Sequence, residues 1–211
     1  MNKEQFIYEI RKLNIELTSD QLEKLDKFYN LFIEWNEKIN LTRITEKEDV
    51  YLKHFYDSLT ITKVIDLNKV ETLCDVGTGA GFPGVVLKIV FPNLKITLVD
   101  ALQKRVNYLN EIIKDLELTD IKAIHTRGED LKEKYDVVTS RAVANIEKLL
   151  SFTMHLVKKD GVMIAMKGNI DQELTEEIQR IIERKYKIIE INRFLLPIEE
   201  SNRSLVVLSH K

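Results

Sequence analysis

The chain has 211 residues, of which 44% are hydrophobic and 31% are charged, and its formal net charge is -2. This length and composition are typical of a soluble globular protein with one hydrophobic core, or with one core and a small addition. The near balance of charge excludes a polycationic chain, so a nucleic-acid partner has to be held by a local basic patch.

The chain offers little material for disulfides, metal sites or membrane insertion. Its single cysteine, Cys74, has no partner for an intramolecular disulfide, and its four histidines lie far apart, without the spacing of metal ligands. The N-terminal segment carries charge every few residues, unlike a signal peptide, and no apolar run approaches the ~20 residues of a membrane span. We therefore expect a cytoplasmic protein with no metal site and no membrane partner.

The first third of the chain has the apolar spacing of helices. Apolar residues three or four positions apart predict three helices, over residues 6–13, 22–35 and 50–61. The second helix has possible N-caps in Thr18, Ser19 and Asp20, and the third follows a possible cap at Thr45 and several acidic residues. We interpret residues 1–66 as an N-terminal helical subdomain.

Short β-rich segments alternate with helical segments in the remainder, residues 67–211. Strands are predicted at residues 71–76, 94–100, 121–126, 135–140 and 161–167, with helices at 82–91, 102–116 and 145–157. This alternation predicts an α/β fold with a mostly parallel sheet. A last helix and two last strands, at residues 171–184, 186–194 and 203–210, predict that the sheet ends in an antiparallel pair. No linker separates the two parts, so we expect them to pack as one body.

Four glycines follow the first predicted strand, where an open α/β sheet binds nucleotide-like ligands. Gly79, Gly81 and Gly84 match the GxGxxG pattern of dinucleotide binders. Gly77, Gly79 and Gly81 match the GxGxG pattern common among S-adenosylmethionine binders. The spacing alone therefore leaves both cofactors open. We expect Pro83 in the first turn of the helix that follows.

Two acidic residues at predicted strand ends favour S-adenosylmethionine. Asp75 precedes the first glycine by two positions, where its charge would repel a pyrophosphate but attract the cationic ammonium and sulfonium groups of S-adenosylmethionine. Asp100 ends the next strand, from which a carboxylate accepts hydrogen bonds from both ribose hydroxyls. Both cofactors would use Asp100, so the preference depends on Asp75. An NAD-dependent oxidoreductase remains the alternative.

Seven segments resemble the RsmG (GidB) family in order and spacing, over nearly the whole chain. They are "WNEKINLT" (35–42), "HFYDSL" (54–59), "DVGTGAGFPG" (75–84), "VDALQKRVNYL" (99–109), "SRAVA" (140–144), "MKG" (166–168) and "RSLVVL" (203–208). The resemblance implies a Rossmann-like S-adenosylmethionine-dependent methyltransferase fold with an N-terminal helical extension. It implies methyl transfer to N7 of one guanosine in helix 18 of 16S ribosomal RNA, near the decoding centre. The expected partner is 16S ribosomal RNA or the small-subunit particle, and the expected state is a monomer.

The resemblance also implies a set of site residues. Six of the expected cofactor contacts follow from the resemblance, and three more belong to the glycine segment and the strand end before it. Together they are Asp75, Gly77, Gly79, Gly81, Phe82, Asp100, Gly128, Glu129 and Arg141. Arg141 is also the one expected catalytic residue, with a structural ion pair to Glu129 or Asp136 as the alternative. Ala101 and Gly128 depart from the residues usual in the family at these positions, but neither change removes a charge.

The chemistry of guanine N7 is consistent with this site. N7 carries a lone pair and no proton, so it attacks a methyl group without the help of a general base. The sequence has neither the paired cysteines expected for carbon methylation nor an Asn-Pro-Pro motif for exocyclic amines. A methyltransferase fold that acts on another RNA or on a small molecule remains a further alternative.

Several cationic residues are expected to contact RNA. Lys104 and Arg105 open a predicted helix, where positive charge opposes the helix dipole and therefore indicates a ligand. Together with Arg127, Lys167 and Arg203 they are expected to contact phosphates at the carboxyl edge of the sheet.

Two conspicuous side chains in the helical part, His54 and Trp35, are assigned to packing, and Asp57 is given no role. His54 shares a helix with Phe55 and Leu59, so we expect it to be packed, and neither it nor Asp57 is placed among the catalytic residues. Trp35 lies on an apolar helix face, so we expect it in the core of the helical part and not in base stacking.

Overall fold

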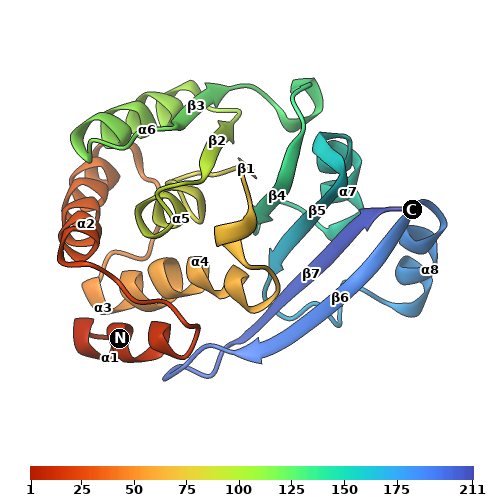
Figure 1. Cartoon of the computed structure of the whole chain (residues 1–211), viewed down its shortest axis with the longest axis horizontal. Coiled ribbons are helices and arrows are strands. Elements are labelled where there is room, and N and C mark those ends of the chain that lie inside the picture. The colour runs from red at the N-terminus through yellow and green to blue at the C-terminus, as the bar shows by residue number, and fades with distance from the viewer.

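The computed structural model describes all 211 residues and contains one seven-stranded sheet in the order β3-β2-β1-β4-β5-β7-β6 (Figure 1). The strands are β1 (Thr72–Val76), β2 (Lys95–Asp100), β3 (Ile121–His125), β4 (Tyr135–Arg141), β5 (Val157–Lys167), β6 (Tyr186–Leu195) and β7 (Asn202–His210). The helices of this part are α5 (Gly84–Val90), α6 (Gln103–Asp115), α7 (Ile146–Thr153) and α8 (Glu176–Lys185).

The sheet is parallel except for one strand. β1 pairs with β2 and with β4, β2 with β3, and β4 with β5, all in parallel. β7 lies between β5 and β6 and is antiparallel to both. The predicted mostly parallel sheet with an antiparallel end is confirmed. The carboxyl ends of β1 to β5 lie at one edge, and the start of β7 joins them there, because Ser204 pairs with Lys167.

The three predicted N-terminal helices are present. They are α1 (Lys3–Arg11), α2 (Ser19–Ile39) and a continuous helical run formed by α3 (Lys47–Val50), a π-helical turn (Tyr51–Tyr56), α4 (Asp57–Leu59) and a 3-10 turn (Thr60–Lys63). Thr18 caps α2, because its hydroxyl accepts from the backbone of Gln21 while the Gln21 side chain accepts from Thr18. The predicted cap at Thr45 is wrong: Glu46 precedes α3 and makes no side-chain cap bond.

Several other predicted boundaries move: the helix predicted at 145–157 ends at Thr153, and the strand predicted at 161–167 begins at Val157. Pro83 lies just before α5 rather than inside its first turn. The last helix was expected from residue 171 but begins at Glu176, because the hydroxyl of Thr175 accepts a hydrogen bond from the backbone of Ile178 at 3.4 Å. None of these shifts changes the order of the elements.

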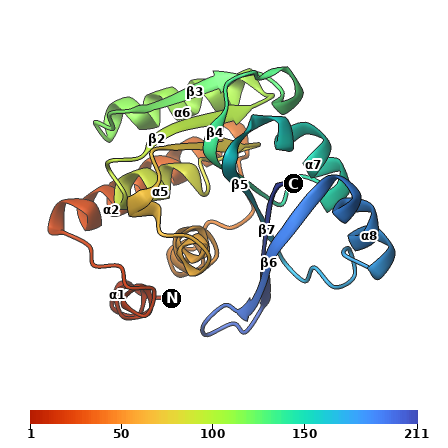
Figure 2. The ribbon, with the colours of Figure 1, turned by 45° about the vertical axis from the view of Figure 1, so that its right-hand side comes forward.

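The helical part and the sheet share one core. Figure 2 shows α2 and α5 on one side of the sheet and α7 and α8 on the other. Phe28 of α2 stacks on Phe55 of the π-helical turn at 5.8 Å and lies 5.4 Å from the ring of Phe82, which precedes α5. Trp35 is half-buried at the rim of this core, edge-on to Tyr108 of α6 at 5.7 Å. The aromatic contacts therefore fix the N-terminal helices against the loop after β1.

No helix of the structure combines the length and the apolar composition that a membrane span needs.

Candidate active site

The loop after β1, residues 77–83, is called the glycine-rich loop here. Gly77, Gly79 and Gly81 have φ values of +73°, +59° and +93°, a backbone region that favours glycine. Asp75 supports the loop from beneath: one of its oxygens, Oδ2, accepts from Thr78 Oγ1 at 2.6 Å and from the backbone nitrogen of Gly84 at 2.9 Å. The loop is therefore held by a carboxylate at the end of its own strand.

Asp75 is only 1% exposed, and its other oxygen, Oδ1, has no hydrogen-bond partner. Burial raises the pKa of this carboxyl to about 6, although the bonds from Thr78 and Gly84 and the nearby charge of Arg141 act to lower it. Asp75 lines neither of the two hollows described next. Any influence it has on a cofactor cation therefore acts through the glycine-rich loop.

The first hollow, called the Asp100 hollow, lies at the carboxyl ends of β1, β2 and β3. It has a volume of about 210 Å³ and is lined by Val76, Gly77, Val99, Asp100, Ala101, Thr126, Arg127, Gly128, Glu129, Val143 and Phe152. Four of the predicted cofactor residues therefore meet here: Gly77, Asp100, Gly128 and Glu129. Four others, Asp75, Gly79, Gly81 and Phe82, shape the loop beside it without lining it.

Asp100 is the buried carboxylate of this hollow. Its Oδ2 accepts from the backbone of Gly79 at 3.0 Å and from Arg105 Nη1 at 3.3 Å, and its Oδ1 accepts from the backbone of Leu102 at 2.9 Å. The carboxylate thus joins the glycine-rich loop to the start of α6. Arg105, expected to contact phosphate, instead contacts Asp100.

Close packing explains why position 128 is occupied by glycine. A Cβ atom there would lie 2.9 Å from the carbonyl oxygen of Phe152 and 3.1 Å from Cγ1 of Val76. The backbone of Gly128 therefore lies closer to Phe152 and Val76 than the backbone of a residue with a Cβ atom could lie. Phe152 of α7 therefore packs directly against the segment after β3.

The second hollow, called the Arg141 hollow, lies across a turn from the first. It has a volume of about 270 Å³ and is lined by Ile44, Lys53, His54, Asp57, Thr60, Arg141, Ala142, Met166, Lys167, Gly168, Phe194, Arg203, Ser204 and Leu205. Ala142 lines this hollow, whereas the next residue, Val143, lines the Asp100 hollow. The turn at residues 141–143 is therefore the wall between the two.

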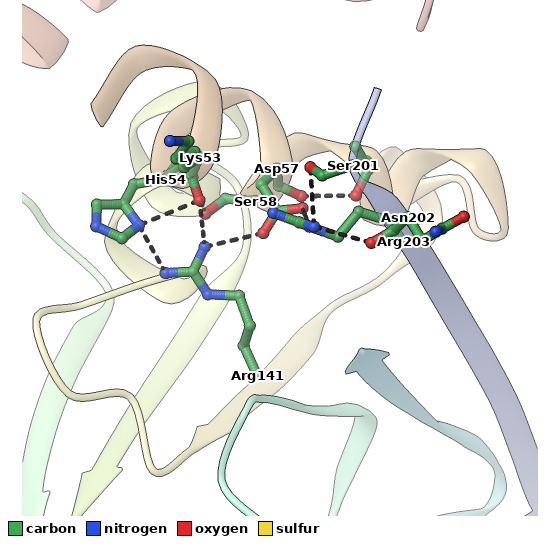
Figure 3. A network of polar contacts seen from close by, with 9 residues as sticks. Lys53, His54, Asp57, Ser58, Arg141, Ser201, Asn202 and Arg203 are labelled. Atoms are coloured by element: carbon green, nitrogen blue, oxygen red, sulfur yellow. Dashed lines mark hydrogen bonds and ion pairs between the residues drawn. The ribbon is translucent and has the colours of Figure 1, made fainter. Parts of the chain in front are cut away.

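Arg141 is held by three groups of the helical part, as Figure 3 shows. Its Nη1 donates to the carbonyl of Lys53 at 2.9 Å and to Asp57 Oδ2 at 3.0 Å, and its Nη2 donates to His54 Nδ1 at 3.1 Å. Arg203 reaches the same carboxylate from β7, with Nε 3.0 Å from Asp57 Oδ1. The ion-pair partner of Arg141 is thus Asp57, and not Glu129 or Asp136 as the alternative prediction had it.

His54 takes part in this network as a neutral side chain. Burial, and then the charge of Arg141, lower its pKa to about 3. Nδ1 lies 3.1 Å from Arg141 Nη2, which only donates, and 3.1 Å from the carbonyl of Lys53, which only accepts, while the buried Nε2 has no partner. The ring stacks on Phe82 at 4.5 Å. The expectation that His54 is packed is met, but it is packed against Arg141 and the glycine-rich loop.

Sequence reasoning left His54 and Asp57 outside the site. The available signal was their spacing, because residues three positions apart on a helix point to the same side. In this structure that side faces Arg141, which lies 84 positions from Asp57 in the sequence. A helical periodicity shows which residues share a face but not which distant strand end the face meets.

The five predicted RNA-binding cations all lie at the carboxyl edge of the sheet, but they differ in exposure and in how far they are already bonded to other groups of the protein. Lys104 and Arg127 are exposed, and Lys104 approaches only the carbonyl of Ile39, at 3.3 Å. Lys167 is bound to Glu173 at 2.9 Å and to the carbonyl of Ala144. With Arg105 and Arg203 also paired, three of the five cations are already engaged within the protein.

The Asp100 hollow fits the adenosine part of S-adenosylmethionine. A Cβ at Gly77 would lie 2.5 Å from Val143 Cγ2, so only glycine leaves this space open. Val76, Val99 and Phe152 give apolar walls suited to an adenine ring, and Asp100 offers carboxylate oxygens suited to ribose hydroxyls.

Solved structures share this fold. A "SAM dependent methyltransferase from Aquifex aeolicus" superposes with a TM-score of 0.60 at 16% identity, covering 80% of this chain and 96% of that one. A ribosomal protein L11 methylase from Lactobacillus delbrueckii subsp. bulgaricus superposes with a TM-score of 0.55 at 18% identity, covering 80% and 81%. These likenesses define the fold class: a Rossmann-like, mostly parallel sheet, here with a glycine-rich loop after β1 and an acid ending β2.

The family follows from the sequence comparisons. The family model "rRNA small subunit methyltransferase G" (GidB) matches residues 21–201. Ribosomal RNA small subunit methyltransferase G of Bacillus pumilus (strain SAFR-032) is 44% identical over 100% of this chain and 91% of its own length. The protein of the same name from Bacillus subtilis (strain 168) is 44% identical over 99% and 90%. The chain belongs to the rRNA small subunit methyltransferase G family, as its motifs predicted.

Proposed function

We propose that this protein transfers a methyl group from S-adenosylmethionine to N7 of one guanosine in helix 18 of 16S ribosomal RNA, near the decoding centre. One observation carries the proposal: the Asp100 hollow and the Arg141 hollow lie on opposite sides of the 141–143 turn. The methyl end of a cofactor whose adenosine lies in the first hollow would reach past the edge of this turn to a base in the second. The choice of N7 and of helix 18 rests on the family resemblance.

In this proposal the cofactor lies in the Asp100 hollow. Gly77 provides the open space, Asp100 accepts from the ribose, and the segment at Gly128 and Glu129 borders the adenine. Asp75, Gly79, Gly81 and Phe82 support the loop that carries Gly77. The residues that the sequence predicted thus divide into those that line the site and those that hold its loop.

The proposed methyl transfer depends on how the two reactants are positioned and requires no proton transfer. S-adenosylmethionine, when bound, supplies a methyl group on a cationic sulfur, and as the N7–C bond forms the C–S bond breaks, leaving its electron pair on sulfur and the positive charge on the purine. No proton moves, so no general base is needed. His54 is neutral with Nδ1 already bonded, and Asp57 is bound to two guanidiniums, which agrees with that requirement.

Arg141 acts in this proposal by fixing the turn between the reactants. Its three bonds to Lys53, His54 and Asp57 hold the wall between the two hollows in one position. A bound geometry with the reacting atoms in line lowers the barrier by the entropy that it removes beforehand. The protein is proposed to act as a cytoplasmic monomer on the small-subunit particle or its RNA.

A nucleoside analysis of ribosomal RNA tests the proposal. Small-subunit particles and naked 16S RNA from cells lacking the protein are incubated with it and with S-adenosylmethionine, then digested and examined by mass spectrometry. One new 7-methylguanosine within helix 18 is expected. Methylation at another atom or another site would contradict the proposal, and competition of NADH for the cofactor site would contradict the cofactor assignment.

A further inference from the structure

The proposed reaction does not by itself explain how guanine is distinguished from adenine, and the Arg141 hollow offers an explanation. N7 is a bare acceptor in both guanine and adenine, so the nucleophile does not separate the two bases. They differ beside it, at C6, where guanine carries an acceptor oxygen and adenine carries a donor amino group. A site that distinguishes the two bases at the edge beside N7 therefore recognises O6. This inference rests on the proposed function.

The charged acceptor of the Arg141 hollow, Asp57, and the carbonyl beside it already accept from cations. Both oxygens of Asp57 are occupied, Oδ2 by Arg141 and Oδ1 by Arg203. The carbonyl of Lys53 accepts from Arg141 as well. The carboxylate side chain is only 7% exposed, so it presents little surface to an incoming base. An amino group entering this hollow would compete with two guanidiniums for these oxygens.

Donors remain free in the same place. A guanidinium has five N–H groups. Arg203 uses Nε for Asp57 and Nη1 for Ser201 and the carbonyl of Asn202, which leaves both N–H groups of Nη2 unused. Its side chain is 23% exposed and lines the hollow, so these donors are within reach of a ligand. The local charge favours an acceptor as well, because the two positively charged guanidiniums of Arg141 and Arg203 share the single negative charge of Asp57.

We propose that the Arg141 hollow receives the target guanine and that Arg203 recognises its O6 through the N–H groups of Nη2. Asp57 is then a positioning residue, which holds Arg203 and Arg141 in place. Met166, Phe194 and other apolar lining groups offer surface for the ring. The hollow, about 270 Å³, is at the lower end of small-ligand pockets and suits one base better than a base pair. An adenine would turn its amino group toward the cations and lose the bond.

A series of base analogues tests this without any mutation. The target guanosine, once mapped, is replaced by inosine, 2-aminopurine or adenosine in RNA reconstituted into small-subunit particles, and kcat/KM for methyl transfer is measured. Inosine keeps O6 and is expected within about threefold of guanosine. 2-Aminopurine and adenosine lack both O6 and the N1 proton and are expected to be slower by roughly 10- to 100-fold, the usual value of a specific base contact. Because a guanidinium only donates, the part of this loss that depends on Arg203 reports on O6.

A variant then connects the effect to one residue. Arg203→Met is expected to lower kcat/KM for guanosine by roughly 10- to 100-fold while changing 2-aminopurine by less than about threefold, so that the preference disappears. Arg193→Met is the matched control, since Arg193 lies on the neighbouring strand β6 in an exposed pair with Asp171 at 2.8 Å. It should keep the wild-type preference. S-adenosylmethionine affinity, measured by calorimetry, reports on folding of both variants.

The outcomes separate the two proposals. Absence of methylation of the natural guanosine by the wild type overturns the proposed function, and this inference with it. Methylation of guanosine with an equal rate on 2-aminopurine overturns only this inference. If Arg203→Met lowers kcat/KM equally on guanosine and 2-aminopurine, this inference is overturned as well. If the variant changes only the salt dependence of methylation, Arg203 is a phosphate contact and the inference is also overturned.

Discussion

His54 and Asp75 are buried ionisable residues that contact the glycine-rich loop from two directions. His54 stacks on Phe82, and Asp75 bonds to Thr78 and Gly84. Burial shifts both pKa values toward the neutral form, that of His54 down to about 3 and that of Asp75 up to about 6. His54 therefore stays uncharged at neutral pH, whereas Asp75 changes its charge just below it.

The raised pKa of Asp75 predicts a pH-dependent stability. The folded state holds the proton more tightly than the unfolded chain, so the free energy of unfolding falls as the pH rises from 3.8 to about 6 and stays lowered above it. A shift of this size corresponds to about 3 kcal/mol. Asp75→Asn removes the effect, so its stability relative to the wild type should rise by about that amount between pH 4 and pH 7.

Urea unfolding of both proteins across this pH range measures the difference. Asp66→Asn is the control, because a hydrogen bond from Lys69 lowers the pKa of this exposed carboxyl and its contribution has the opposite sign. A constant difference between Asp75→Asn and the wild type would show that the carboxyl has the same pKa in the folded and unfolded states, and that burial does not raise it.

Local sequence patterns predicted most elements of the fold. The apolar runs of β1 and β2 and the glycines between them are signals carried by neighbouring residues, and they placed Gly77 and Asp100 in one hollow correctly. The Asp57 network was not predictable in the same way, because it joins three segments distant in sequence. The burial of Phe82 away from the Asp100 hollow was equally hidden, since it depends on packing by α2.

The glycine-rich loop, as an element, gives a matched pair of substitutions. Gly77 and Gly79 both have positive φ, so alanine at either position brings similar backbone strain, about 1–2 kcal/mol. Only at Gly77 does the new Cβ meet a wall of the Asp100 hollow, Val143, at 2.5 Å; at Gly79 the nearest atom is 4.0 Å away. Gly77→Ala should weaken S-adenosylmethionine binding clearly more than Gly79→Ala.

Calorimetric titration of both variants measures this difference, with roughly tenfold against roughly threefold as the expected losses of affinity. Adding Val143→Ala to Gly77→Ala removes the contact and should restore part of the lost binding. Equal losses at the two glycines, or no recovery in the double variant, would show that strain alone is responsible and that Val143 does not limit the hollow.

The whole molecule combines a near-neutral net charge with cations at one edge of its sheet. A single cluster of 36 buried hydrophobic residues extends from the N-terminal helices to β7, so the helical part cannot move freely away from this edge. Of the five edge cations, Arg105 is unsuitable for testing RNA contact alone, because it bonds to Asp100. Lys104 has no acidic partner, and it lies at the exposed start of α6.

Charge reversal on α6 separates a local RNA contact from net charge. Lys104→Glu is expected to raise KM for the small-subunit particle roughly fivefold near 0.1 M salt and to reduce the salt slope of binding by about one, as the loss of one phosphate contact does. Affinity for S-adenosylmethionine should stay within about threefold. Lys114→Glu, which makes the same charge change in the last turn of α6, where Lys114 is 76% exposed, should match the wild type. Equal effects of the two variants would mean that the particle senses only the overall charge, and that its RNA contacts lie away from the start of this helix.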